Sequence, residues 1–321
     1  MISNNCLITV GITCFNAEKT IANAINSALC QLWRPIEIVI VDDCSSDNGF
    51  EILKRMAVQY KEIRIFRNSK NKGVAYSRNR IIENSKGIFL AFFDDDDISL
   101  PSRLSHQYKR IIEYEKRFAE GNHVICHSAR KIIYKNQKEL LENTMGDNVK
   151  LIAPNGISVA KRILIGKPLR NGYGSIATCT QMARLQTYKF VGGFDNSFRR
   201  SEDTELNIRL AFIGAHFVGT KKVLVLQNMT NCGEKNIEEE IFYFKLLIKK
   251  HKFLISDKEF EFSSKWLDLK ILFFKGKILK IIFLIFISFK RFPYLTLIRL
   301  TLSIRNSLKN IYFAQFLKKR F

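Results

Sequence analysis

The stretch Ile88-Phe89-Leu90-Ala91-Phe92-Phe93-Asp94-Asp95-Asp96-Asp97 decides the fold class of this 321-residue chain. Its six apolar residues predict a buried β-strand, and four carboxylates follow that strand directly. Adjacent like charges repel, so a fold that places four of them at a strand end needs a cation to neutralise them. A solvated acidic loop is the alternative, and the position directly after a buried strand argues against it. We therefore predict a divalent metal ion at this strand end.

The residues before this stretch alternate between strand-like and helix-like patterns. Apolar runs at Leu7–Thr13, Ile36–Val41 and Ile63–Phe66 predict three further strands, and helical periodicity lies between them. This rhythm is typical of a Rossmann-like α/β fold, an open and mostly parallel sheet with flanking helices. Ligands of such sheets bind beyond the carboxyl ends of the strands, which is where the carboxylate run lies.

Two other predicted strands also end in polar residues. The first strand leads into Thr13-Cys14-Phe15-Asn16, and the second leads into Asp42-Asp43. Asp42 and Asp43 taken alone are explained by a β-turn before a helix, because Asp favours both positions. Three polar strand ends in one sheet favour a shared binding crevice instead.

The pattern changes after Pro101, and the later elements are less regular. Residues 142–174 are rich in Gly and Pro, which predicts long loops with short elements. The other predicted elements are a helix from Arg103 to about Glu115, strands at Val124–Ala129 and Ile132–Tyr134, a helix capped by Ser201 that ends near Gly214, and a strand at Lys221–Leu226.

The charge of the chain is strongly basic and unevenly distributed. The net charge is +22, which indicates an anionic partner such as nucleic acid, an anionic membrane or a phosphorylated substrate. Leu269–Phe321 holds twelve Lys or Arg residues and no Asp or Glu. Seven cysteines without a C-x-x-C pair argue against a zinc site or a disulfide framework and favour a reducing compartment. Met1–Asn5 does not resemble a signal peptide.

The C-terminal segment mixes Ile, Leu and Phe with Lys and Arg. Its longest uncharged run, Ile281–Phe289, has nine residues, far fewer than the roughly 20 that a helix needs to cross a bilayer. We predict a basic amphipathic helical segment that lies on an anionic membrane surface. A helical hairpin that packs on the preceding domain and leaves its charges in solvent is the alternative.

Five motifs together resemble, in order and spacing, the family 2 glycosyltransferases of the GT-A fold. The resemblance covers about residues 6–230. The motifs are Ile8-Thr9-Val10-Gly11-Ile12-Thr13-Cys14-Phe15-Asn16, Ile38-Val39-Ile40-Val41-Asp42-Asp43-Cys44-Ser45-Ser46-Asp47, Asn71-Lys72-Gly73-Val74-Ala75-Tyr76-Ser77-Arg78-Asn79, Phe92-Phe93-Asp94-Asp95-Asp96-Asp97 with Pro101, and Gly192-Gly193-Phe194-Asp195 followed by Glu202-Asp203.

The resemblance implies roles for individual residues. Asp96 would bind Mn²⁺ or Mg²⁺ at the donor diphosphate, and Asp203 would be the catalytic base, although charge complementarity at a helix N-terminus also explains Asp203. Phe15 replaces the commoner Tyr, and Cys44 replaces a usual Gly. The nucleotide-binding positions would be Thr13, Phe15, Asn16, Asp43, Arg78, Asp94 and Asp95.

The resemblance also implies an activity and a domain organisation. It implies an inverting, metal-dependent transfer of one sugar from a nucleotide-diphosphate sugar, with a UDP-sugar favoured, to a glycan or lipid-linked saccharide in surface polysaccharide or lipopolysaccharide synthesis. The Q-x-x-R-W motif of processive relatives is absent. The expected catalytic domain is 1–235, with a nucleotide-sugar half at about 1–110 and an acceptor half at 111–235, and the tail is 236–321. The expected location is the cytoplasm, peripheral on the cytoplasmic face of the membrane.

Two other classes of function compete with this interpretation. A basic nucleic-acid-binding protein would explain the charge, but the basic residues concentrate in an apolar tail while the predicted cleft is acidic. A transferase-like sugar-binding module without activity would explain the motifs, but its acidic positions are intact. We therefore expect no nucleic-acid partner.

Overall fold

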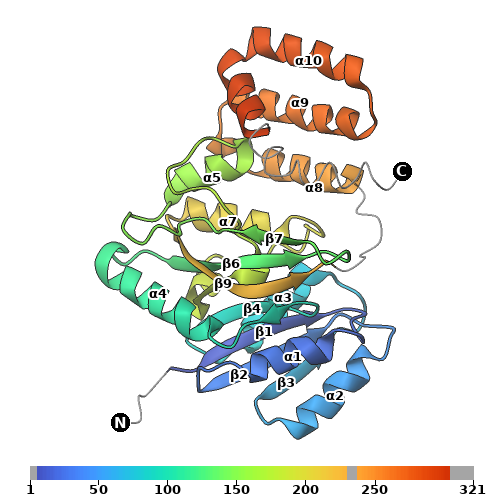
Figure 1. Cartoon of the computed structure of the whole chain (residues 1–321), viewed down its shortest axis with the longest axis vertical. Helices are drawn as coiled ribbons and strands as arrows, with labels where there is room; N and C mark the ends of the chain where they lie inside the picture. The colour runs from blue at the N-terminus through green and yellow to red at the C-terminus, as the bar shows by residue number, and fades with distance from the viewer. Residues whose placement is uncertain (1–5, 230–236, 304–321) are drawn as a thin grey trace. The chain divides into compact units, whose positions relative to one another are not determined.

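The computed structural model describes residues 6–229 and 237–303 (Figure 1). The chain divides into two compact units: the first takes in the chain up to Val159 and Leu169–Glu234, and the second takes in Ala160–Pro168 and the chain from Lys235 onward. Met1–Asn5, for which we expect no signal peptide, lies outside the described residues, and so does the part of the predicted tail after residue 303.

The first unit is built on a mixed sheet whose first four strands are parallel. β1 (Ile8–Cys14), β2 (Ile36–Asp42), β3 (Ile63–Arg67) and β4 (Phe89–Asp94) lie in the order β3-β2-β1-β4. Every residue of β2 is buried, as expected for a mainly apolar strand that has a neighbour on each side in a parallel sheet. The predicted α/β class and the four strands are confirmed.

Three helices connect these strands. They are α1 (Ile21–Leu29), α2 (Gly49–Gln59) and α3 (Val74–Asn84). α3 packs on β1 and β2 (Figure 1). The approach is close at Gly11, where a Cβ atom would lie 2.5 Å from the side chain of Ile81. A glycine in β1 therefore sets the distance between α3 and the sheet.

Antiparallel pairings extend the sheet beyond β4. β8 pairs antiparallel with β4 and with β6, and β6 runs parallel to β9. The two predicted strands at 124–129 and 132–134 form a single strand, β6, and the predicted strand at 221–226 is part of the longer β9. The bounds are β5 (Ile98–Ser99), β6 (Val124–Ile133), β7 (Glu139–Glu142), β8 (Met182–Arg184) and β9 (His216–Asn228).

The stretch that predicted long loops with short elements contains one helix. Gly156–Ile165 forms α5, whose residues from Ala160 onward belong to the second unit. Ser201 is the N-cap residue of α7, as predicted, but its backbone is left-handed with φ 62° and its side chain makes no capping hydrogen bond. The remaining helices are α4 (Arg103–Phe118), the 3₁₀ turn η1 (Thr178–Thr180), α6 (Leu185–Phe190) and α7 (Glu202–Phe212).

The described part of the second unit is helical. α9 begins with a capping box between Ser256 and Glu259, and a turn at Gly276 with φ 66° leads into α10, which packs on α9 (Figure 1). None of the helices in the described ranges is both long enough and apolar enough to cross a bilayer. The elements are α8 (Ile237–Lys250), η2 (Lys252–Leu254), α9 (Asp257–Phe274), α10 (Ile278–Arg291) and a helical segment from residue 293.

Candidate active site

The second strand end holds its two aspartates in different environments. Asp42 is fully buried, accepts hydrogen bonds from the backbone and hydroxyl of Ser45, and forms an ion pair with Arg67 at 3.1 Å. These contacts belong to the β-turn that was the alternative explanation for Asp42 and Asp43. Cys44 adopts φ 63° in that turn, the left-handed conformation that favours glycine, which is the residue that the resemblance implies at this position.

Asp43 is buried and binds the loop that leads into α3. Its carboxylate accepts hydrogen bonds from the backbone N–H groups of Lys72 at 2.9 Å and Gly73 at 2.8 Å, and from the Asn68 amide at 2.6 Å. Both oxygens therefore already accept bonds from the protein. The structure places Asp43 directly after β2 at the carboxyl edge of the sheet, where it anchors the start of α3, and its contact with a nucleobase stays a prediction.

The end of β1 faces the end of β4. Thr13 lies beside Asp94 in the parallel register, and the backbone N–H of Phe15 donates to Asp95 Oδ2 at 3.0 Å. The Phe15 ring is 47% exposed, so its face is available to a flat ligand. Asn16 is engaged with the neighbouring turn, since its side-chain oxygen accepts the N–H of Ser46 at 2.9 Å.

The four carboxylates Asp94–Asp97, which begin with the last residue of β4, are not equivalent. Asp94, Asp95 and Asp96 are partly exposed, whereas Asp97 is buried and accepts the N–H of Asn228 at 3.3 Å. Burial raises the pKa of Asp95 to about 7, although the bond from Phe15 opposes that rise. Burial also raises the pKa of Asp97 to about 8, and the charges of Asp94 and Asp96 add to the effect. The positive charges near Asp94–Asp97 therefore do not fully balance the negative charges of these carboxylates.

The chemistry of this strand end fits a hard divalent cation. Within the described ranges, the buried Oδ2 atom of Asp97 has no hydrogen-bond partner. Ligand atoms of Asp94, Asp97 and Cys179 lie within 4.8 Å of one another. The Cys179 thiol suits such an ion poorly, because burial raises its pKa and Arg130 already donates to its sulfur at 3.3 Å. Carboxylate oxygens of the run are the fitting ligands.

One arginine joins this strand end to the first turn of α7. Arg78, which is buried, donates to Glu202 Oε1 at 2.7 Å and to Asp94 Oδ1 at 3.4 Å. Its guanidinium lies over the ring of Phe194 at 5.3 Å. Burial opposes the Arg78 charge, but the nearby carboxylates outweigh it and raise the pKa of Arg78. Burial raises the pKa of Glu202 to about 7 against the opposing effect of Arg78.

Asp203 follows Glu202 in the first turn of α7, where the helix dipole favours a carboxylate. Its Oδ1 atom accepts the N–H of Thr204 at 2.6 Å. Its charge acts on Arg78, so it belongs to the same electrostatic cluster as Asp94. The structure therefore brings Asp203 and Arg78 together with the carboxylate run.

Sequence reasoning missed the contacts that hold Phe194 in place. The Asn79 side chain donates to the Phe194 carbonyl at 2.8 Å and accepts the Phe194 N–H at 2.7 Å. A Cβ atom on Gly193, whose φ is 68°, would lie 2.4 Å from Asn79 Oδ1. The two adjacent glycines, Gly192 and Gly193, were the sequence feature that could have indicated this close approach of the backbone to Asn79. Glu202, the partner of Arg78, carried no signal beyond its place beside Asp203.

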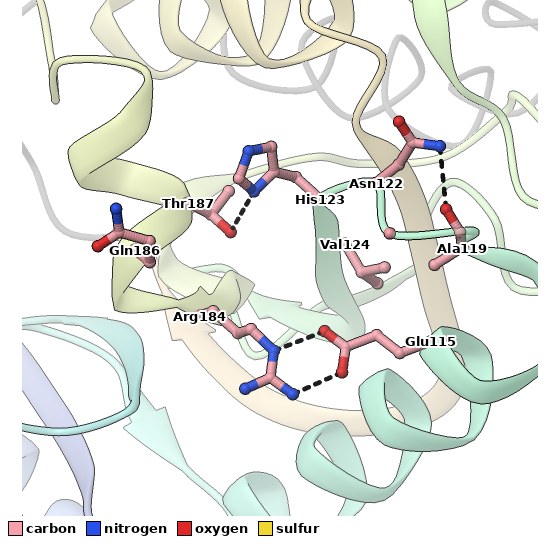
Figure 2. Close-up of a pocket in the computed structure, with 9 residues that line it drawn as sticks. Glu115, Ala119, Asn122, His123, Val124, Arg184, Gln186 and Thr187 are labelled. Atoms are coloured by element: carbon pink, nitrogen blue, oxygen red, sulfur yellow. Dashed lines mark hydrogen bonds and ion pairs between the residues drawn. The ribbon is translucent and has the colours of Figure 1, made fainter.

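A separate cavity of about 380 Å³ lies at the opposite edge of the sheet (Figure 2). Its lining includes Val124, the first residue of β6. Because β4 and β6 are both antiparallel to β8, they run in the same direction, so the start of β6 lies at the edge opposite the carboxyl end of β4. Arg184 forms two hydrogen bonds with Glu115 at 2.7 and 2.8 Å, and His123 contacts the Thr187 hydroxyl at 3.1 Å. These polar groups pair with one another, and the cavity has no part in the site described above.

Comparisons with known proteins agree on one family. Residues 9–171, about half of the chain, match Glycosyl transferase family 2. The chain is 34% identical over 112 residues to the Escherichia coli UDP-Glc:alpha-D-GlcNAc-diphosphoundecaprenol beta-1,3-glucosyltransferase WfaP, which covers 35% of the chain and 43% of WfaP. It is 35% identical over 101 residues to the putative glycosyltransferase EpsE of Bacillus subtilis, which covers 31% of the chain and 36% of EpsE. The chain thus spans less than half the length of these relatives.

Solved structures share the fold. Residues 1–349 of S. aureus TarS in complex with UDP-GlcNAc superpose with a TM-score of 0.59 at 18% identity, over 81% of this chain and 70% of that one. The mannosyltransferase PcManGT from Pyrobaculum calidifontis, in complex with GDP-Man and Mn²⁺, gives a TM-score of 0.54 at 14% identity, over 78% of this chain and 65% of that one. Together with the family match, these likenesses show that the chain has the GT-A fold and belongs to glycosyl transferase family 2.

Proposed function

We propose that this chain transfers a single sugar, with inversion, from a nucleoside diphosphate sugar to a glycan or lipid-linked saccharide. The observation that carries the proposal is the bridge made by Arg78, which binds Asp94 at the end of β4 and Glu202 at the start of α7. This bridge joins the strand end suited to a donor diphosphate to the helix turn that presents Asp203. Donor and acceptor chemistry would therefore share one electrostatic cluster.

The donor side would use the ends of β1, β2 and β4. The exposed ring of Phe15 would stack on the nucleobase beside Thr13 and Asn16, with Asp43 at the base edge and Asp94 or Asp95 toward the ribose. Asp96, with Asp94 beside it, would hold Mn²⁺ or Mg²⁺ through carboxylate oxygens. Such an ion, when bound, stabilises the negative charge that develops on the leaving diphosphate.

The acceptor side would use Asp203 as general base. Its Oδ1 atom is fixed by Thr204, and the carboxylate would take a proton from the attacking hydroxyl. Glu202 is engaged by Arg78 at 2.7 Å, so it would position this turn rather than accept the proton. A base opposite the leaving group is the arrangement for a single displacement, which inverts the anomeric carbon.

The names of relatives support a substrate class. WfaP is named for UDP-Glc and a GlcNAc-diphosphoundecaprenol acceptor, and TarS is solved with UDP-GlcNAc. We infer a UDP-sugar as donor and a polyprenyl-linked saccharide as acceptor, in surface polysaccharide or lipopolysaccharide synthesis. The basic second unit would hold the enzyme on the cytoplasmic face of the membrane, near such an acceptor.

A transfer assay tests this proposal. The full chain is incubated in detergent with Mn²⁺, UDP-Glc or UDP-GlcNAc, and a synthetic GlcNAc-diphospholipid, and the product is identified by mass spectrometry and by the anomeric coupling in its NMR spectrum. Asp203→Asn should retain UDP binding and lose about 10²–10⁴-fold in transfer rate. Glu51→Gln, a change of the same kind at an exposed site, should leave the rate unchanged. Wild-type transfer by Asp203→Asn would show that the base lies elsewhere.

A further inference from the structure

The outer face of α10 is apolar, which is the reverse of an ordinary surface helix. Leu279 is 84% exposed, Ile278 66% and Phe283 63%. Ser288 is the buried side chain of α10, and it lies on the opposite side of the helix at helical spacing. α10 packs on α9, so that opposite side is the covered one. We define the outer face of α10 as Ile278, Leu279, Ile282, Phe283, Phe286 and Phe289, all exposed.

This apolar surface continues around the turn into α9 and is bordered by cations. Phe273 and Phe274, the last two residues of α9, are exposed beside the turn at Gly276. Lys277, Lys280 and Lys290 are exposed at or next to α10, and the chain from Leu269 to Phe321 contains no Asp or Glu. An exposed apolar surface with lysines at its margins is the pattern of a helix that lies in a membrane interface.

We propose that the outer face of α10 inserts among the acyl chains at the surface of an anionic lipid bilayer, with the bordering lysines at the headgroups. The proposal rests on the membrane association proposed above and names the element that makes it. α10 has 14 residues and is about 21 Å long, shorter than the roughly 30 Å hydrocarbon core, so it would lie in the plane of the membrane. The predicted amphipathic segment would thus bind through apolar insertion as well as charge.

Charge favours lipid over a second copy of the chain as the partner of this face. Lys277, Lys280 and Lys290 are exposed at the margins of this face in each copy, so pairing two outer faces would bring like charges together. Anionic headgroups neutralise the same lysines. α9 and α10 do form the helical hairpin of the predicted alternative, but the exposed surface of α10 is mainly apolar and not only charged.

Vesicle sedimentation of the full chain tests the proposal. Sucrose-loaded vesicles of phosphatidylcholine with 30% phosphatidylglycerol are compared with pure phosphatidylcholine at about 0.15 M salt. The triple variant Ile282→Gln, Phe283→Gln, Phe286→Gln keeps good helix formers and should bind the anionic vesicles at least tenfold more weakly. The matched control replaces Leu32 and Val58, exposed apolar residues of the first unit, by Gln and should bind like wild type. Circular dichroism and light scattering verify the fold and the oligomeric state of each variant.

A second readout reports insertion directly. Tryptophan introduced by Phe286→Trp should be quenched by brominated lipids, whereas tryptophan introduced by Val58→Trp should not. Unchanged vesicle binding by the triple variant, no quenching at position 286, or a wild-type dimer that the triple variant converts to a monomer would each overturn the proposal. Nucleotide binding is measured on the same samples. If the wild-type protein bound vesicles but no nucleotide, the result would contradict the proposed sugar transfer and leave the membrane proposal standing.

Discussion

Replacing Arg78 should destabilise the first unit more than the loss of any surface ion pair. The side chain of Arg78 is 7% exposed, and its partners Glu202 and Asp94 are largely shielded. Removing one member of a buried pair leaves the other charge without compensation, which typically costs about 3–5 kcal/mol. We expect Arg78→Met to lower the free energy of unfolding by about that amount, out of roughly 5–15 kcal/mol for a typical domain.

The double variant separates this charge effect from the loss of packing. Arg78→Met combined with Glu202→Gln removes the buried carboxylate together with its partner, so it should recover at least about 1–2 kcal/mol of the loss. The control is the exposed pair of Lys54 and Glu51, whose nitrogen and oxygen lie 2.6 Å apart. Lys54→Met should change the free energy of unfolding by less than about 1 kcal/mol.

Urea denaturation followed by tryptophan fluorescence measures these differences. The chain has two tryptophans, Trp33 in the first unit and Trp266 in the second, so a Trp266→Phe background lets Trp33 report on the first unit. The reasoning would be refuted if Arg78→Met unfolded at the wild-type midpoint with an unchanged slope. It would also fail if the double variant were less stable than Arg78→Met alone.

Three further changes have defined expected outcomes. Burial raises the pKa of Asp97 to about 8 in the folded protein, whereas an Asp in the unfolded chain has a pKa of about 4. The neutral carboxyl group therefore contributes to the free energy of unfolding fully below about pH 4, and this contribution is lost as the pH rises through about 8. The melting temperature should therefore fall less from pH 6 to pH 9 in Asp97→Asn than in wild type, and equal falls would contradict the assignment. Gly193→Ala should destabilise more than Gly192→Ala, since both have positive φ but a Cβ atom meets Asn79 only at Gly193; equal urea midpoints would count against this contact. Asp43→Ala should expose the start of α3 to faster amide exchange at Lys72 and Gly73, and wild-type exchange rates there would show that the carboxylate is not the anchor.

The first half of the sheet could be predicted because its signals are local. β1, β2 and β4 are mainly apolar, as buried parallel strands are, and polar residues stand at the end of each strand. The position of the Asp94–Asp97 run at the carboxyl edge followed from the same pattern. Positions of the later strands were harder to predict, because β8 has three residues and β7 has four, too few to show a period.

The contacts inside the site could not be predicted because they join distant parts of the sequence. Arg78 and Glu202 are 124 residues apart, and Asp43 binds Gly73 across 30 residues. Ser201 has the residue type of a helix cap but takes a left-handed backbone, which propensity does not reveal. In α10 ten of the 14 residues are apolar, so periodicity alone could not tell which face α9 covers.

Calorimetric titration of the full chain with UDP, GDP, CDP and dTDP, each with and without Mn²⁺, tests the central claim most directly. The proposed function predicts that one nucleotide binds, that binding needs Mn²⁺, and that Asp96→Ala abolishes it while circular dichroism shows an intact fold. Failure of all four nucleotides to bind folded protein would contradict the proposal that this chain uses a nucleotide-sugar donor.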